Sequence, residues 1–505
     1  MVGVDLRRSL SMNSVEFEAI QGIVRFGYGK LTESCFLLAT IKDADQARLW
    51  LDTAPVANAV IRSEAPQTAL QVAFTYEGLR NLGCSTELLS QFSTEFKVGL
   101  DDSARARLLG DVGDSSPDQW LWGSKSNHAD VLFMLYARPA TLETWKGSIL
   151  TPQWDAAFEV VTELKTSNLD GVEPFGFTDG VSQPEFDWER SRVPRQIEDA
   201  YTNRICLGEV LLGYPNEYNH YTDRPLLPLD SASAEVLPIA EEQADMRDFG
   251  RNGSYLVLRT LEQDVEEFWR FVREHTDDDE AAETMAAAMV GRRKDGSPLA
   301  APSSHIIPGV DRNDFHNQFD FSSDPDAVKC PFGAHIRRAN PRNGDLPSPP
   351  VTGITRFLTL LGLGHKTLHS DAKASSRFHR ILRRGREYAG SPVLPPSSDQ
   401  DKGKGLHFMC LNANLARQFE FLQSAWLMST KFDALTDESD PLIGSRETIE
   451  GAAPSNCFSL AGTRFGERKT VEGLPRFVRV RGGAYFFLPS LASLRYLASV
   501  GSSRQ

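Results

Sequence analysis

Short apolar segments of strand length alternate with short helical segments along this chain, and the alternation occurs twice. In the first cycle, strand-like runs at 35–41, 70–76 and 130–136 are separated by helix-like stretches at 43–51 and 77–82. The aspartate at position 43 is suited to cap the first helix, and the glycine at position 83 to end the second. This alternation predicts an α+β or α/β layered fold.

The second cycle begins near residue 250 and continues almost to the end of the chain. A strand at 250–259 is followed by a helix at 263–275, and glycine-preceded strands follow at 405–411 and 482–488. The 505 residues also exceed the size, about 250–300 residues, at which a single hydrophobic core stops growing. Two similar domains are therefore expected, at 1–235 and 236–505.

Composition narrows the classes of partner. The hydrophobic content of 41% and the charged content of 24% are ordinary for a globular protein. Asp and Glu number 68 against 54 Lys and Arg, which gives a formal net charge of −14. This balance argues against nucleic acid or an anionic membrane as the main partner and favours a neutral or cationic substrate.

The cysteines and the N-terminal segment bear on location. Six cysteines are spread singly, without a C-x-x-C pair or a C-x-x-C-H motif for covalent haem attachment. This distribution favours reduced thiols, although an even number leaves disulfides open. No apolar stretch follows Arg7-Arg8, so we expect no export signal, no membrane span and a cytoplasmic location.

Two segments contain most of the chemistry. Residues 175–184 read Phe-Gly-Phe-Thr-Asp-Gly-Val-Ser-Gln-Pro, in which two glycines flank Asp179 in a turn that can approach a ligand closely. Residues 330–342 read Cys-Pro-Phe-Gly-Ala-His-Ile-Arg-Arg-Ala-Asn-Pro-Arg and offer one imidazole, His335, beside several cations. Those cations suit acidic groups such as the propionates of haem.

Together the two segments resemble the dye-decolorizing (DyP-type) haem peroxidases. The resemblance covers roughly residues 18–490 and is closest to the long-chain branch of the family. It includes four further segments, at 208–214, 252–255, 383–385 and 440–444. It implies an α+β fold of two ferredoxin-like domains with antiparallel sheets, with haem b, one per chain, in the cleft between them. The first domain would hold the distal aspartate loop and the second the proximal histidine.

The resemblance also implies roles for three residues. His335 would ligate the haem iron. Asp179 would transfer a proton between the two oxygens of hydrogen peroxide before their bond breaks. Arg383 would stabilise the hydroperoxide and the departing hydroxide, with Arg384 as the next choice in a segment rich in arginine.

Three further positions follow from the resemblance with alternatives left open. Asp440 would accept the second ring proton of the proximal histidine, and Glu420 is the alternative. Arg337 would bind a haem propionate, unless it is simply an exposed arginine. Compact bacterial members often carry asparagine two positions after the distal arginine, where this chain has Gly385, so the role of that asparagine does not transfer.

The function implied by the resemblance is a peroxidase. Hydrogen peroxide would oxidise the haem to compound I, and small-molecule electron donors such as dyes or phenols would return it to the resting state. The alternative is a haem-handling protein that carries, stores or releases haem or its iron, with incidental peroxidase activity.

Overall fold

Each of the two cycles forms an antiparallel sheet with the same strand order. The computed structural model describes residues 14–192, 203–300, 316–342, 376–394, 403–433, 435–447, 455–461 and 468–500. The first sheet runs β2-β3-β1-β4, with bounds β1 Glu33–Ile41, β2 Thr68–Phe74, β3 Val131–Ala137 and β4 Phe158–Lys165. The second runs from β10 and β11 through β13 and β9 to β18, with bounds β9 Ser254–Gln263, β10 Leu382–Arg383, β11 Arg386–Gly390, β13 Gly403–Asn412 and β18 Val478–Leu488.

This shared order is the ferredoxin-like arrangement, so the predicted α+β fold is confirmed. The two sheets join edge to edge, where Phe74 of β2 pairs with Phe487 of β18, and a ten-stranded sheet results. The short strand β12 (Val393–Leu394) extends the far edge by pairing with β4. The boundary at 235/236 falls inside a single 3₁₀ turn, η5 (Ala234–Val236), between β4 and β9. That boundary stays a prediction.

Both faces of the joined sheet are covered. In β1, Cys35 and Leu37 belong to one buried cluster, whereas Phe36 and Leu38 belong to the cluster on the opposite face. A strand that is buried on both faces needs apolar side chains at consecutive positions, which explains the continuous apolar run in the sequence.

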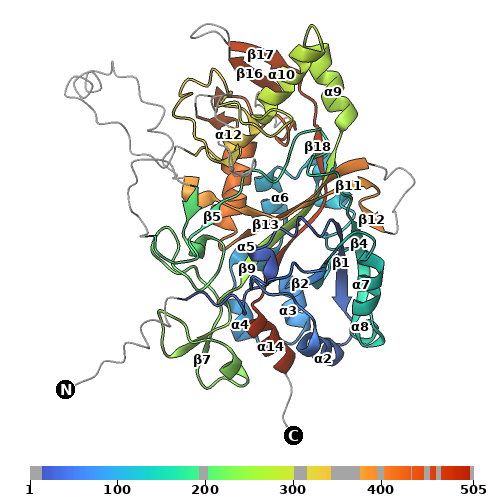
Figure 1. Ribbon diagram of the computed structural model, residues 1–505, viewed down its shortest axis with the longest axis vertical. Helices are drawn as coiled ribbons and strands as arrows, with labels where there is room; N and C mark the ends of the chain where they lie inside the picture. Colours follow the sequence, from blue (N-terminus) through green and yellow to red (C-terminus); the bar gives the residue numbers. More distant parts are fainter. Residues whose placement is uncertain are drawn as a thin grey trace, which may run out of the picture.

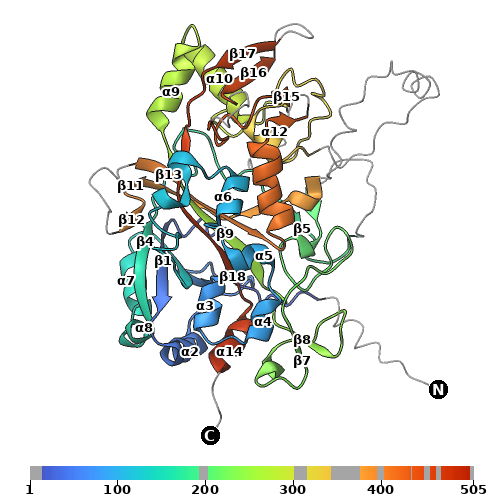
Figure 2. The same cartoon turned by 180° about the vertical axis from the view of Figure 1, so that it is seen from behind.

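The helices gather in groups at opposite ends of the molecule. Helices α2, α7, α8 and α14 lie at one end, and α9 and α10 lie at the other (Figures 1 and 2). The bounds are α2 Ala44–Thr53, α3 Tyr76–Asn81, α4 Thr86–Ser90, α5 Thr94–Val98, α6 Ser103–Leu109, α7 Leu142–Ile149, α8 Pro152–Ala157, α9 Val265–Glu274, α10 Asp279–Val290, α12 His335–Ala339 and α14 Leu491–Ser499. Two π-helical segments, η9 (Ala416–Glu420) and η10 (Leu422–Met428), follow β13. In the described part of the chain, no helix has both the length and the apolar character needed to cross a membrane.

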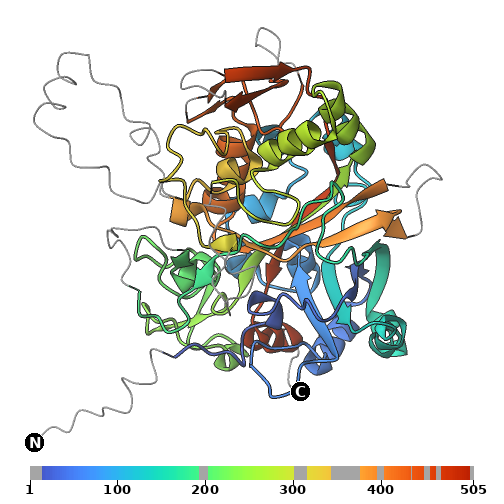
Figure 3. The same cartoon turned by 45° about the horizontal axis from the view of Figure 1, so that its top comes forward.

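Small two-stranded ribbons and 3₁₀ turns complete the fold. The ribbons pair β5 Glu185–Phe186 with β6 Arg204–Ile205, β7 Leu226–Pro228 with β8 Met246–Asp248, β14 Lys431–Phe432 with β15 Leu435–Thr436, and β16 Cys457–Ala461 with β17 Arg468–Glu472. The other 3₁₀ turns are η1 Gly22–Val24, η2 Gly113–Ser115, η3 Pro117–Gln119, η4 Leu207–Glu209 and η8 Ser376–His379. The β16–β17 ribbon lies beside α9 and α10 (Figure 3), and the three elements share one apolar cluster.

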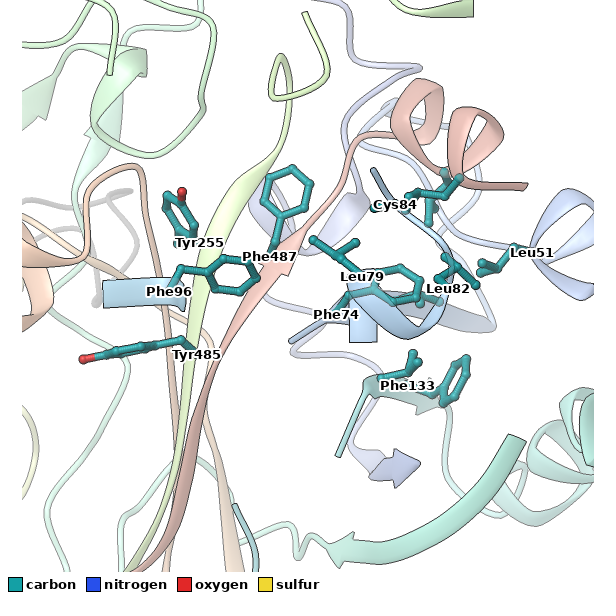
Figure 4. Packing of buried hydrophobic residues seen from close by; sticks show 14 of the residues in the cluster. Leu51, Phe74, Leu79, Leu82, Cys84, Phe96, Phe133, Tyr255, Tyr485 and Phe487 are labelled. Carbon is teal, nitrogen blue, oxygen red and sulfur yellow. The ribbon is translucent and has the colours of Figure 1, made fainter. Parts of the chain in front are cut away.

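The largest apolar core is common to the two halves. Phe96 from α5 packs against Tyr255 of β9, with ring centroids 5.5 Å apart, and Phe487 lies beside them (Figure 4). The same cluster includes Phe74 and Phe133 of the first half. Because one core is built from both halves, their relative position is set by packing over a large apolar area.

Local signals in the sequence are confirmed where the structure describes them. The Asp43 carboxylate caps α2 by accepting hydrogen bonds from the N–H groups of Asp45 and Gln46. Gly83 follows α3 with a φ of 99°, as expected for a glycine at a helix end. All six cysteines are unpaired thiols, and five of them are buried.

Candidate functional site

A large cavity lies against the second sheet. Strands β9, β13 and β18 line it together with α12, η9, η10 and the loop that contains Asp179. The space not filled by atoms amounts to about 1920 Å³ when the open solvent at the mouth is included. Most of the lining is apolar, including Phe175, Phe177, Phe419 and Leu442. A roomy apolar cavity with a few polar groups is the usual form of a ligand or cofactor site.

The turn that brings Asp179 to the cavity requires its glycines. Gly176 has a φ of 101° and Gly180 a φ of 76°, which are conformations that L side chains rarely adopt. The turn is fastened by Glu173, whose carboxylate accepts hydrogen bonds from the N–H groups of Phe175 at 3.0 Å and Phe177 at 2.9 Å. Asp179 itself donates its main-chain N–H to the carbonyl of Gly171 at 3.0 Å. The side chain of Asp179 is thereby held on a fixed backbone.

Asp179 and Arg383 form an ion pair at the cavity wall. Nη1 of Arg383 donates to Oδ1 of Asp179 at 2.8 Å, and Nη2 donates to the carbonyl of Ser182 at 3.3 Å. The two side chains are 31% and 30% exposed, and both line the cavity. Burial alone would raise the pKa of Asp179, but the charge of Arg383 and the N–H of Gly180 hold it below its ordinary value. Asp179 is therefore a carboxylate, ready to accept a proton.

His335 begins helix α12 and also lines the cavity. Its Nδ1 lies 2.9 Å from Oδ2 of Asp440, a fully buried carboxylate. Burial would raise the pKa of Asp440, but the neighbouring His335 and Arg338 and the N–H of Ile443 hold it low. Because Asp440 is ionised, Nδ1 of His335 carries the proton and donates it. The lone pair of the imidazole is then on Nε2, which has no hydrogen-bond partner among the described residues.

Of the two acidic residues considered for this contact, Asp440 makes it and Glu420 does not. Glu420 accepts two hydrogen bonds from Nη1 of Arg105, at 2.6 and 2.7 Å, and one from the hydroxyl of Tyr485 at 2.8 Å. Oδ1 of Asp440 is held in addition by the N–H groups of Leu442 and Ile443, both at 2.9 Å.

The structure does not bring Arg337 to the cavity. Its guanidinium donates to Oδ2 of Asp324 at 3.1 Å and to the carbonyl of Cys330 at 2.8 Å. It also lies over the rings of Phe321 and Phe332, at 4.5 Å from each centroid. On the short helix α12, Arg337 is two residues beyond His335 and so lies on a different face. The arginine is buried, so it matches neither the propionate partner nor the exposed arginine considered from the sequence.

Gly385 lies where the chain passes close to β13. A Cβ atom there would be 2.6 Å from the main-chain oxygen of His407. A residue larger than glycine at this position would push the segment away from β13.

Among the polar residues of the cavity wall that sequence reasoning missed are Glu173 and Arg292. Burial raises the pKa of Glu173 to about 7, against the hydrogen bonds that it accepts. Arg292 donates to the carbonyls of Gly296 at 2.6 Å and His316 at 3.1 Å, and to Oγ of Ser182 at 2.7 Å. Neither residue belongs to a motif that the sequence displays.

Arg292 has no carboxylate partner in the described part of the chain. Burial, together with the nearby charges of Arg342 and Arg383, lowers its pKa to about 9. A buried arginine that faces a cavity without a counter-charge favours an anionic group on the ligand of that cavity.

Known proteins of similar sequence are peroxidases. No protein-family model matches the chain. The multifunctional dye peroxidase DyP2 of an Amycolatopsis species is 30% identical over 446 residues, which cover 85% of this chain and 82% of that protein. The dye-decolorizing peroxidase msp1 of Mycetinis scorodonius is 28% identical over 513 residues, which cover 95% of this chain and 87% of that protein.

Solved structures show the same fold. A fungal DyP-type peroxidase from Auricularia auricula-judae superposes with a TM-score of 0.68 at 23% identity, over 96% of this chain and 99% of that one. The DyP-type peroxidase of Anabaena gives a TM-score of 0.66 at 23% identity, over 95% of this chain and 94% of that one. On the strength of these similarities over most of its length, the chain belongs to the family of dye-decolorizing (DyP-type) peroxidases, which are oxidoreductases that use hydrogen peroxide.

Proposed function

We propose that the chain binds haem b, one per chain, in the cavity between His335 and the Asp179–Arg383 pair, and uses it to oxidise small aromatic donors with hydrogen peroxide. The observation that carries the proposal is the arrangement of these three residues. The imidazole of His335, whose Nε2 has no hydrogen-bond partner among the described residues, lines the same cavity as the ion pair of Asp179 and Arg383.

The residues of the cavity fit haem. The apolar walls suit a porphyrin, and the buried Arg292 suits one of its carboxylates. The described residues contain no group of three or more His, Cys, Asp or Glu side chains that could hold a metal ion by themselves. A single imidazole is instead the protein ligand expected for an iron whose other ligands come from a macrocycle.

Bound haem supplies the two electrons that reduce hydrogen peroxide and accepts them back singly from a donor. In the proposed mechanism, the Asp179 carboxylate takes the proton from one peroxide oxygen and delivers it to the other. The fixed charge of Arg383 stabilises the negative charge that develops on the peroxide oxygens while the proton moves and water departs. Oδ2 of Asp440 accepts the hydrogen bond from Nδ1 of His335. This bond would make Nε2 of His335 a stronger electron donor to the iron.

The donor class follows from the family. One structurally similar dye-decolorizing peroxidase was solved in complex with 2,6-dimethoxyphenol, at a TM-score of 0.67 and 22% identity. For this chain, phenols and dyes of similar size are the proposed donors.

The proposal is tested by the visible absorption spectrum of protein expressed with ample haem, before and after adding equimolar hydrogen peroxide. We expect a ferric histidine–haem Soret band that falls within the mixing time and recovers on addition of 2,6-dimethoxyphenol. A stable band that peroxide leaves unchanged, with ready transfer of haem to an apo-acceptor, would instead favour a haem-handling protein.

The ligand assignment has its own test. His335→Ala should lose stable haem binding, whereas His128→Ala, which alters an exposed histidine, should bind haem as the parent does. An unchanged ferric spectrum in His335→Ala would show that the iron is ligated elsewhere.

A further inference from the structure

The side chain of Gln183 forms two hydrogen bonds with the main chain of Arg383. Its Nε2 donates to the carbonyl of Arg383 at 3.0 Å, and its Oε1 accepts the N–H of Arg383 at 3.0 Å. Gln183 lies four residues after Asp179 in the same loop. One amide side chain therefore connects the loop that contains the carboxylate to the strand that contains the guanidinium.

The position of Arg383 in the sheet explains why such a contact is needed. Arg383 lies in β10, the strand at the end of the sheet order, and β10 pairs with β13 on one side only. The main-chain groups of an edge strand lack a strand partner on the open side. Gln183 satisfies both groups of Arg383 there, in the way that a neighbouring strand would.

Gln183 is itself held in place by its main-chain carbonyl. This carbonyl accepts a hydrogen bond from Nδ2 of Asn203 at 2.6 Å and another from Nδ2 of Asn317 at 2.8 Å. Oδ1 of Asn203 in turn accepts a bond from Nη2 of Arg380, which lines the cavity. The amide of Gln183 is thus attached to a backbone that is fixed from two other segments.

From this geometry we infer that Gln183 is a positioning residue, which sets the placement of Arg383 relative to Asp179 and so the rate of reaction with hydrogen peroxide. The inference rests on the proposed roles of Asp179 and Arg383. The ion pair is held at its tips by the bond of 2.8 Å between the two side chains. Gln183 holds the ion pair at the main chain, because the loop and the strand cannot slide past each other while both hydrogen bonds of the Gln183 side chain persist. A displacement of about 1 Å in a catalytic group is enough to slow a reaction by about a hundredfold.

The chain provides a matched control in Gln91. Nε2 of Gln91 donates to the carbonyl of Leu226 at 2.9 Å, and Oε1 accepts the N–H of Leu226 at 2.9 Å. This is the same two-bond contact between a glutamine and a strand, and Gln91 does not line the cavity. Gln183→Leu and Gln91→Leu therefore remove the same pair of bonds at two different places, and Gln91→Leu also removes a bond of 3.2 Å from Nε2 to the carbonyl of Glu87.

With haem bound, we expect Gln183→Leu to lower the second-order rate constant for hydrogen peroxide at least tenfold and to leave the KM for the phenolic donor unchanged. The acid limb of the pH–activity profile of Gln183→Leu should move to higher pH, because a displaced Arg383 would lower the pKa of Asp179 by less. Gln91→Leu should stay within twofold of the parent. Amide hydrogen exchange should quicken in the peptide containing Arg383 only in the first variant. Gln183→Glu, which keeps the bond to the N–H, gives an intermediate rate and serves if Gln183→Leu does not fold.

A double variant separates positioning from general damage. If Gln183 acts through Arg383, then adding Gln183→Leu to Arg383→Leu should change the peroxide rate less than twofold. Multiplied losses in the double variant would overturn the inference, as would a parent-like rate in Gln183→Leu while Arg383→Leu is slow. A parent-like rate in Arg383→Leu itself would instead overturn the proposed role of Arg383.

Discussion

At the scale of single residues, the chemistry depends on how each ionisable group is paired. Asp179 and Asp440 are both ionised because an adjacent cation or imidazole outweighs the cost of burial. Arg292 is the opposite case, a buried cation that lines the cavity beside neutral acceptors. These pairings, more than the residue types, determine which groups move a proton and which bind a charge.

Removal of Arg383 should affect both the rate and its pH dependence. The charge of Arg383 holds the pKa of Asp179 below its usual value, so the carboxylate persists into acid. In Arg383→Leu, burial is no longer opposed by that charge, so the pKa of Asp179 rises. On acidification, the variant should therefore lose activity at a higher pH than the parent does. We expect stopped-flow traces with hydrogen peroxide to be more than tenfold slower, with the acid limb shifted upward. An unmoved acid limb would mean that Asp179 does not titrate in that limb.

Arg337 and Arg292 should respond differently to substitution. Arg337→Met breaks a buried ion pair with Asp324, at 3.1 Å, and should lower the free energy of unfolding by about 3–5 kcal/mol. It should leave haem affinity in the folded protein unchanged. Arg292→Met should weaken haem affinity, measured by transfer of haem to an apo-acceptor. Equal haem affinity in the two variants would contradict the assignment of Arg292 to an acidic group of the cofactor.

At the scale of elements, the loop before Asp179 is a rigid support. Glu173 closes a turn by accepting two main-chain N–H groups, and Gly176 and Gly180 adopt positive φ on either side of the aspartate. The loop is then bound to the edge strand β10 through Gln183. A catalytic group on a loop needs such support, because loops are otherwise the most mobile part of a fold.

A substitution at Gly176 tests this support. Gly176→Ala forces a side chain to adopt a φ of 101°, which should cost about 1–3 kcal/mol of stability although no atom blocks the new Cβ. Gly147→Ala is the control, because Gly147 is exposed within α7 and its Cβ would also meet nothing. That change should stabilise the protein by about 0.5–1 kcal/mol. Urea unfolding of both variants measures the difference, and equal stabilities would show that the turn relaxes.

At the scale of the whole molecule, buried ionisable groups set the pH dependence of stability. Glu209 is 1% exposed, and burial raises its pKa to about 7 in spite of the charge of Arg417. The pKa of Glu173 is raised to about 7 for the same reason. The pKa of such a carboxyl is higher in the folded protein than in the unfolded chain. Its contribution to stability is then complete at a pH below the unfolded-state pKa, and it is lost as the pH rises through the folded-state pKa.

The contribution of Glu209 to stability should therefore fall as the pH rises from 4.5 to about 7. Burial lowers the pKa of His379 and of His407 to about 4, so these two histidines act in the opposite sense over much of the same range. The loss from Glu209 alone is on the order of 3 kcal/mol. Chemical denaturation across this range should show that the parent loses stability relative to Glu209→Gln as the pH rises, because only the parent has the carboxyl that titrates. Glu235→Gln, at an exposed position, should follow the parent curve. A Glu209→Gln curve parallel to that of the parent would show that Glu209 titrates normally.

Much of the fold was predictable because its signals are local. The strand at β1 and the helix α2 follow from a run of apolar residues and a capping aspartate, which act over a few positions. The edge-to-edge joining of the two sheets through Phe74 and Phe487 was not predicted, since strand pairing depends on contacts between residues distant in the sequence.

What the sequence by itself determined is the set of local motifs: the glycine-flanked turn around Asp179, the segment that contains His335, and the alternation of strands and helices in two cycles. Only the tertiary structure decided which side chains meet across the chain. Asp179 and Arg383 are 204 positions apart, and His335 and Asp440 are 105 positions apart. Local conformation depends on neighbouring residues, whereas an ion pair or a counter-charge depends on which distant segments the common core brings together.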